Sequence, residues 1–152
     1  MVAASPFRQP TLYDTDETGW LERTAQLISE GRLAEVDTAS LHEYLTDMAR
    51  RDRREIERRL FLFLAHVLKW EYQPEKRSAS WRRTIRSQRK EIVSLVKSET
   101  LRHYAEQILP SCYVEAKEFA AEETGLDDST FPRESNLTLD AWLAFEPVGE
   151  TP

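Results

Sequence analysis

The segment from Ile56 to Trp70 constrains the fold of this chain more than any other part of the sequence. Apolar residues recur along it at the spacing that places side chains on one face of an α-helix. This stripe consists of Ile56, Leu60, Phe63, Val67 and Trp70, and it is widened almost to a full circle by Leu62, Leu64, Ala65 and Leu68. A helix that is apolar on nearly all sides lies at the centre of a domain, so the sequence predicts an all-α fold built around this segment.

Periodicity and capping residues predict a bundle of four to five main helices with a short C-terminal helix. The predicted helices cover residues 16–30, 37–72, 81–97 and 98–125, followed by a short helix from residue 138. Gly31 and Gly125 stand where a left-handed residue ends a helix. The chain has only four glycines, fewer than an all-β fold with tight turns requires. We expect one helical domain over residues 1–152, with a loose N-terminal arm over residues 1–10.

Two positions leave the course of the helices open. The stretch 49–55 is charged apart from Ala49, so the second helix either runs through it or is split there by a tight turn. We favour a long helix with an irregularity near Arg50. Pro110 lies inside the fourth helical pattern, where its ring should kink or split the helix.

Specific core residues follow from the same helical spacing. In the first helix the expected buried residues are Trp20, Leu21, Thr24, Leu27 and Ile28. In the third helix they are Trp81, Ile85, Ile92, Val93 and Val96. The basic residues between them should then lie mostly outside.

The charge of the chain is strongly segregated. Between Arg50 and Lys90 there are 14 Lys or Arg and 5 Asp or Glu, although the net charge of the chain is −6. Arg82, Arg83, Arg86 and Lys90 fall on adjacent rows of one helix, which would suit a surface that tracks nucleic-acid phosphates. In the alternative, which we favour, the basic residues are solvated or pair with acidic residues of the fourth helix. Those acidic residues are Glu115, Glu118, Glu122 and Glu123.

A second candidate site consists of Glu43, Asp47 and His66. The two carboxylates are one helical turn apart and share a face. If the second helix splits near Arg50, Glu43 could approach His66, and the set could serve a metal-dependent hydrolase or nuclease by acid–base chemistry. The favoured alternative is a histidine whose ring nitrogens are satisfied inside the core. We therefore expect no metal site and no cofactor.

Lys69 and Arg89 form a third candidate, an anion or phosphate pocket beside the aromatic residues Trp70 and Trp81. A guanidinium at the edge of a buried seam needs a carboxylate or an aromatic face. We favour an ion pair of Arg89 with a residue such as Glu43 or Glu123 over an open anion site. The single cysteine, Cys112, is expected to pack in the core.

The sequence resembles a bacterial family known as domain of unknown function 29. The most specific part of the resemblance is His66-Val67-Leu68-Lys69-Trp70 followed by Trp81 and Arg89, and the likeness extends from Leu12 to Pro147. It implies an all-α fold in a cytoplasmic bacterial protein, and it supplies no activity, substrate or cofactor. Where the family tends to have consecutive acidic residues, this chain has His42-Glu43.

No catalytic motif stands out, so the leading hypothesis is a non-enzymatic helical interaction module. The longest strongly apolar stretch, residues 60–68, is too short to span a membrane, and we expect a cytoplasmic protein. Surplus apolar positions such as Phe61 suggest a homodimer. Nucleic acid remains an alternative partner.

Overall fold

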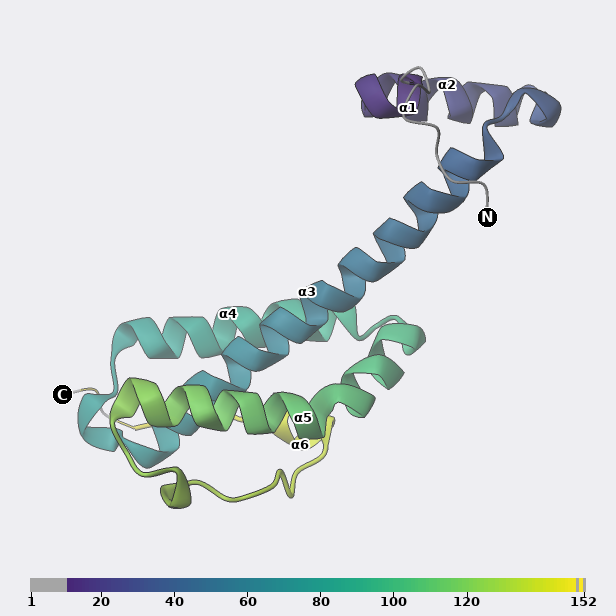
Figure 1. Ribbon diagram of the computed structural model, residues 1–152. Coiled ribbons are helices and arrows are strands. Elements are labelled where there is room, and N and C mark those ends of the chain that lie inside the picture. The colour runs from purple at the N-terminus through teal and green to yellow at the C-terminus, as the bar shows by residue number, and fades with distance from the viewer. Residues whose placement is uncertain (1–10, 150, 152) are drawn as a thin grey trace. The chain divides into compact units, whose positions relative to one another are not determined.

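The computed structural model describes residues 11–149 and 151, and these residues form helices with no β-strand among them (Figure 1). The prediction of an all-α fold is therefore confirmed. The α-helices are α1 (Leu12–Thr15), α2 (Glu17–Ser29), α3 (Thr38–Tyr72), α4 (Ala79–Leu95), α5 (Glu99–Thr124) and α6 (Leu139–Leu143). Three 3-10 turns are η1 (Leu33–Glu35), η2 (Pro74–Lys76) and η3 (Asp128–Thr130). The N-terminal arm expected over residues 1–10 lies outside the described residues.

The chain divides into two compact units, Met1–Ala49 and Arg50–Pro152. The first unit contains α1, α2 and the first residues of α3, and the second contains the rest of α3 and the helices that follow. The single domain expected over residues 1–152 stays a prediction. No helix in the described part of the chain has the length and apolar content needed to cross a membrane.

The first unit is built around Trp20. The carboxylate of Asp16 caps α2 by accepting a hydrogen bond from the Gly19 amide at 3.0 Å. One turn later the buried Trp20 ring lies 4.7 Å from the Tyr13 ring and 5.8 Å from the Tyr44 ring, measured between centroids. Ile28, expected in the core, is 47% exposed, so that prediction is wrong for the last turn of α2.

The helix α3 is continuous from Thr38 to Tyr72 and therefore passes through Arg50 without a break. Its charged middle carries its own pairs, because Glu55 contacts Arg58 at 3.0 Å and Arg59 at 2.6 Å, spacings that support a helix. Arg, Glu and Ala are good helix formers, so the segment stays helical without an apolar face. The helix ends before Gln73-Pro74, as the sequence predicts.

The core of the second unit forms around the C-terminal part of α3. The predicted stripe is buried throughout, at Ile56, Leu60, Phe63, Val67 and Trp70. The α4 residues Ile85 and Ile92 and the α5 residues Ala105, Ala116 and Ala120 belong to the same core. Val93 is 45% exposed, so its predicted place in the α4 seam is wrong.

The helix α5 is one element that contains Pro110. Ser98 caps it by accepting from the Leu101 amide at 3.3 Å, and Gly125 ends it with a φ of 70°, as expected for a left-handed terminator. Of the two outcomes expected at Pro110, a kink or a split, the split does not occur, and Figure 1 shows that α5 changes direction along its length. The Phe119 ring packs on Phe61 of α3 at 5.3 Å between centroids.

Candidate functional site

Trp70 is the centre of a contact between α3 and residues 145–149, a segment that we call the C-terminal strap. The indole Nε1 of the buried Trp70 donates a hydrogen bond to the Val148 carbonyl at 3.1 Å. The guanidinium of Arg82 lies 5.2 Å from the centroid of the Trp70 ring and donates through Nη2 to the Gly149 carbonyl at 2.8 Å. Arg82 is thus half-buried and directed toward the strap.

Arg89 binds the beginning of the same strap. Its Nη1 donates to the Phe145 carbonyl at 2.5 Å and lies 2.7 Å from Oε1 of Glu146. The carboxylate partner is therefore Glu146, a residue far along the sequence, and neither Glu43 nor Glu123 forms an ion pair with Arg89 in the described structure. The Nη1 donor of Arg89 is thus already occupied by the strap.

Lys69 is buried on α3, with its ammonium Nζ 4.8 Å from the centroid of the Trp81 ring. Burial lowers the pKa of Lys69, and the negative charge of Glu123 offsets part of that effect. Within the described residues Lys69 has no ion pair, so the Trp81 ring is its main electrostatic partner. The two cations of the predicted anion pocket thus have different surroundings: Lys69 faces an aromatic ring, and Arg89 binds the strap.

His66 is half-buried and held by its own helix. Its Nδ1 lies 2.8 Å from the Leu62 carbonyl, a contact that makes Nδ1–H the donor and leaves Nε2 as the acceptor of a neutral ring. Burial lowers the pKa of His66 and outweighs the hydrogen bond to Leu62, which raises it, while the charges of Lys69 and Glu123 act in opposite directions. The ring is therefore neutral at neutral pH.

The metal or acid–base set of Glu43, Asp47 and His66 requires a turn near Arg50. The structure has no such turn, because α3 is a single helix from residue 38 to residue 72. Among the described residues, no group of three or more His, Cys, Asp or Glu side chains is arranged to hold a metal ion.

The residues Arg83, Arg86 and Lys90 form a row of cations on α4, which we call the α4 row. They follow one another at i, i+3 and i+7, so they share one face of the helix, and all three are exposed. Together with Arg82 and Ser87 they line a surface hollow of about 440 Å³. Of the four predicted nucleic-acid residues, the structure therefore presents three outward and turns Arg82 toward Trp70.

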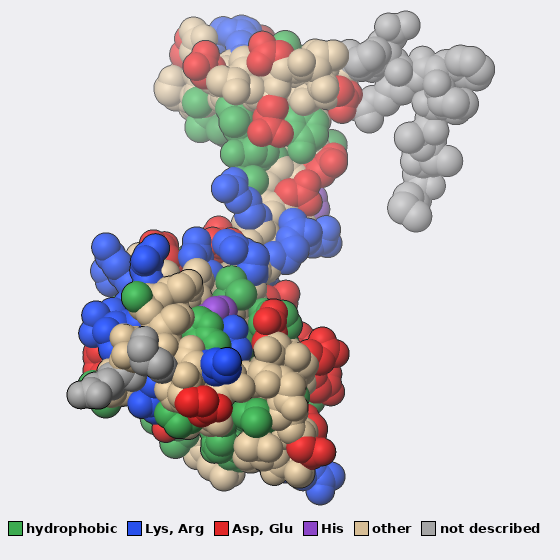
Figure 2. Space-filling view, turned by 90° about the vertical axis from the view of Figure 1, so that its left-hand side faces the viewer, with side chains coloured by type: hydrophobic (Ala, Val, Ile, Leu, Met, Phe, Trp, Pro, Cys, Tyr) green, Lys and Arg blue, Asp and Glu red, His purple; other side chains and the backbone are tan. Residues whose placement is uncertain are grey.

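A second row of cations with the same spacing lies on α3. Arg51, Arg54 and Arg58, the α3 row, also stand at i, i+3 and i+7 and are exposed. The two helices meet nearby, because Nη1 of Arg59 donates to the side-chain oxygen of Gln88 at 3.3 Å. Figure 2 shows Lys and Arg side chains gathered over one part of the surface of the second unit.

Most of these cations have no carboxylate partner. In the part of the chain that the structure describes, the α4 row, Arg51 and Arg54 form no ion pair, and Arg58 pairs with Glu55 at 3.0 Å. Within the described residues, the acidic α5 residues expected to neutralise the basic segment form no ion pair with either row. For these two rows, pairing with the acidic residues of α5, one of the two favoured explanations of the basic segment, is thus not what the side chains show.

Cys112 is buried, with its Sγ 3.9 Å from the Glu57 carbonyl. Burial, with smaller contributions from the carboxylates of Glu115 and Glu57, raises the pKa of the thiol to about 12. A thiol with such a pKa is protonated at neutral pH and is a poor nucleophile.

The sequence reasoning missed the guanidinium contacts of Trp70. Arg77 lies 5.0 Å from the Trp70 ring and donates through Nε to the Trp70 carbonyl at 2.8 Å, so two arginines contact one indole. For Arg89, stacking on Trp70 or Trp81 was only the alternative to the favoured ion pair, and the arginines that stack on Trp70 come from the turn and first part of α4. The Arg-rich stretch that closely follows Trp70 in the sequence was the available signal.

The comparisons with known proteins identify the family. The chain matches the family model described as domain of unknown function DUF29 over residues 12–146, and it belongs to this family. No curated protein and no solved structure gives a significant match to the chain.

Proposed function

We propose that this chain is a non-enzymatic helical interaction module that binds the phosphates of nucleic acid through the α4 row and the α3 row. The observation that supports the proposal is the lack of ion pairs at five of the six cations, within the described residues, in a chain whose net charge is −6. Unpaired cations gathered on one region attract a polyanion, whereas scattered or paired cations do not.

The dimensions of the rows suit a phosphate backbone. Seven residues of α-helix, the span from Arg83 to Lys90, rise about 10 Å. One DNA strand carries a phosphate about every 3.4 Å along the axis, or about three over that length. Three side chains on one face can therefore each approach one phosphate. The acidic remainder of the chain repels the same polyanion, which restricts the contact to the basic region.

Salt-dependent binding tests this function. Anisotropy titrations of a labelled DNA duplex and a labelled single-stranded RNA, between about 50 and 200 mM salt, should give affinities that fall linearly on a log–log plot. The variant R83Q/R86Q/K90Q should reduce the slope by about 0.9 per lost contact on duplex DNA and about 0.7 on a single strand.

A matched control has the same change in net charge elsewhere in the second unit. Lys76, Lys97 and Arg133 are exposed and form no ion pair in the described structure, so K76Q/K97Q/R133Q should keep the original slope. The proposal fails if the wild-type chain shows no salt-sensitive binding at low salt, or if the control loses as much slope as the α4 variant.

We also propose a second copy of the chain as a partner, seated on the first unit. Ile28, Leu33 and Leu45 are 47%, 62% and 57% exposed, and Figure 2 shows hydrophobic side chains gathered on the surface of this unit. Exposed apolar side chains at neighbouring positions favour association. Phe61, the residue first considered for this role, is half-buried against Phe119.

Light scattering at high micromolar concentration should give the mass of a dimer, and the variant L33E/L45E should give a monomer. A wild-type chain that stays monomeric would remove this partner. We place the module in the bacterial cytoplasm, as the family resemblance implies, and cell fractionation with an antibody to the chain tests that location.

A further inference from the structure

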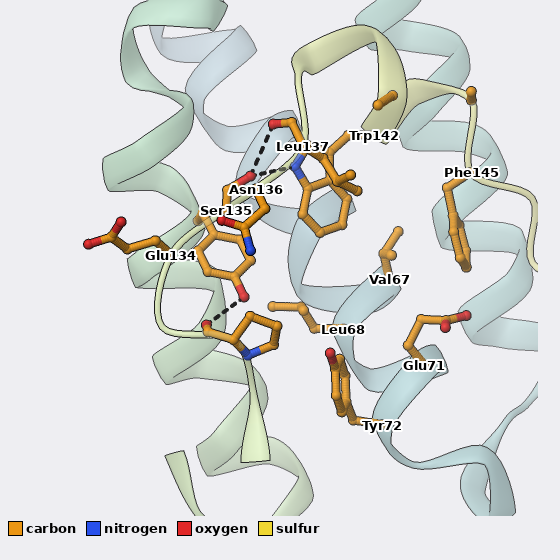
Figure 3. Close-up of a pocket in the computed structure, with 14 residues that line it drawn as sticks. Val67, Leu68, Glu71, Tyr72, Glu134, Ser135, Asn136, Leu137, Trp142 and Phe145 are labelled. Atoms are coloured by element: carbon orange, nitrogen blue, oxygen red, sulfur yellow. Dashed lines mark hydrogen bonds between the residues drawn. The ribbon is translucent and has the colours of Figure 1, made fainter. Parts of the chain in front are cut away.

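A pocket of about 340 Å³ opens in the second unit, apart from the basic rows (Figure 3). It is lined by the end of α3, by Tyr113 of α5, by Pro132 and the loop residues 134–137, and by α6 with the two residues that follow it. Its volume falls at the lower end of the range typical of small-molecule sites, about 300–1,000 Å³. In Figure 3, Val67 and Leu68 of α3 lie between Trp142 and Tyr72.

Four of the 14 residues that line the pocket are aromatic. Tyr72, Tyr113, Trp142 and Phe145 contribute four rings. The polar atoms of the two most buried rings already have partners in the protein, since the Tyr113 hydroxyl donates to the Pro132 carbonyl at 2.7 Å and the Trp142 Nε1 donates to the Ser135 Oγ at 2.8 Å. These two rings therefore offer a ligand apolar and π surface, with their donors already used.

The charges at the pocket are all negative. Glu71 and Glu134 line it and no Lys or Arg does. Neither carboxylate forms an ion pair within the described residues, and both are exposed. In Figure 3, Glu71 lies near Tyr72 and Phe145, whereas Glu134 lies on the opposite side of the pocket.

We propose that this pocket binds a small organic cation with an apolar body. Aromatic rings attract a cation through their π faces, and an organic ammonium group loses less hydration than a metal ion when it enters such a site. The unpaired carboxylate of Glu71 adds a complementary charge at the edge of the aromatic walls. Anions are disfavoured, because no Lys or Arg lines the pocket while two carboxylates do.

The test uses the full chain with benzyltrimethylammonium as the probe, and benzenesulfonate and benzyl alcohol as anionic and neutral counterparts. Nitrogen–proton correlation spectra report the indole N–H of Trp142, which is assigned with the variant Trp142→Phe. The cation should shift this signal saturably, the alcohol should bind more weakly and the sulfonate should not bind. Equal shifts with cation and sulfonate, or no saturable shift with the cation, overturn the proposal.

Two variants and one control locate the site. Glu71→Gln should weaken binding of the cation about two- to fivefold, the usual effect of one exposed charge pair. Ala141→Phe places a ring in the pocket and should abolish saturable binding. Glu75→Gln, at an exposed carboxylate outside the pocket, should leave the affinity unchanged, and the proposal fails if it weakens binding as much as Glu71→Gln.

Discussion

The ammonium of Lys69 lies 4.8 Å from the centroid of the Trp81 ring, and both residues lie within the part of the chain that matches the family model. Lys69 is also buried, and burial lowers its pKa from the ordinary value of 10.5. This pair therefore connects α3 to α4 while it keeps a charge inside the second unit.

The Lys69 side chain should make stability depend on alkaline pH. Because its pKa is lower in the folded chain than in the unfolded chain, the unfolded chain binds the proton more tightly in the window just below 10.5. Folding is thus penalised at neutral pH, and the penalty decreases as the pH rises through that window. Urea unfolding of wild type and Lys69→Met at pH 7 and pH 10 should show wild type gaining stability relative to the variant. If the difference in unfolding free energy between wild type and Lys69→Met is the same at pH 7 and pH 10, the lowered pKa of Lys69 is contradicted.

His66 should make stability depend on acid pH. Burial lowers the pKa of His66 from its ordinary value of 6.5, so the unfolded chain takes up the proton first as the pH falls. The free energy of unfolding should therefore decrease below about pH 6.5. The variant His66→Asn keeps a donor for the Leu62 carbonyl and should not show the part of this decrease that His66 causes. Unfolding curves at pH 7.5 and pH 5 test it, and parallel losses in both proteins would show that His66 is not responsible.

Arg89 should stabilise the chain through the strap. The variant Arg89→Gln removes the hydrogen bond of the guanidinium to the Phe145 carbonyl, a charge-assisted bond of the kind worth about 1.5–3 kcal/mol. Glu146→Gln removes the carboxylate from the same guanidinium, and because Glu146 is 56% exposed the cost should be at most about 1 kcal/mol. Chemical unfolding of the two variants measures the difference, and a larger loss for Glu146→Gln would contradict this ranking.

Cys112 should resist thiol reagents while the chain is folded. A rise of its pKa from 9.0 to about 12 lowers the thiolate fraction at neutral pH by about a thousandfold. Labelling with an aromatic disulfide reagent should be slow in buffer and fast in denaturing urea. The variant Ser111→Cys, at the exposed neighbouring position, should label rapidly in the folded chain and serves as the control for reagent activity.

Local chemistry explains which features the sequence could predict. The side chains of Asp16, Ser78, Ser98 and Thr138 cap helices within three residues of themselves, so a reader of the sequence can place those helix starts. The periodicity of residues 56–70 likewise depends only on the helix and on burial. The four-residue helix α1 was missed, because a single turn closed by a capping box at Thr11 has too few residues for a periodic pattern.

The candidate sites depend on contacts between distant segments, and these could not be read in the same way. Nothing near Arg89 in the sequence indicates Glu146 or the Phe145 carbonyl as its partner. The exposure of Val93 depends on which other helix packs against α4. Periodicity alone shows that α4 has a buried face, but it does not show which residues lie at the edges of that face. The aromatic pocket likewise combines residues of α3, α5 and α6 with a loop that has no repeating pattern.

The strap is held through its main chain. Trp70, Arg82 and Arg89 donate to the carbonyl oxygens of Val148, Gly149 and Phe145, and a carbonyl oxygen is the same whichever side chain follows it. Among relatives, the three donors should therefore vary little, while the exposed positions of residues 145–149 can diverge. The expected exceptions are Pro147, which is buried, and Gly149, whose φ of 120° is a backbone conformation that L side chains rarely adopt.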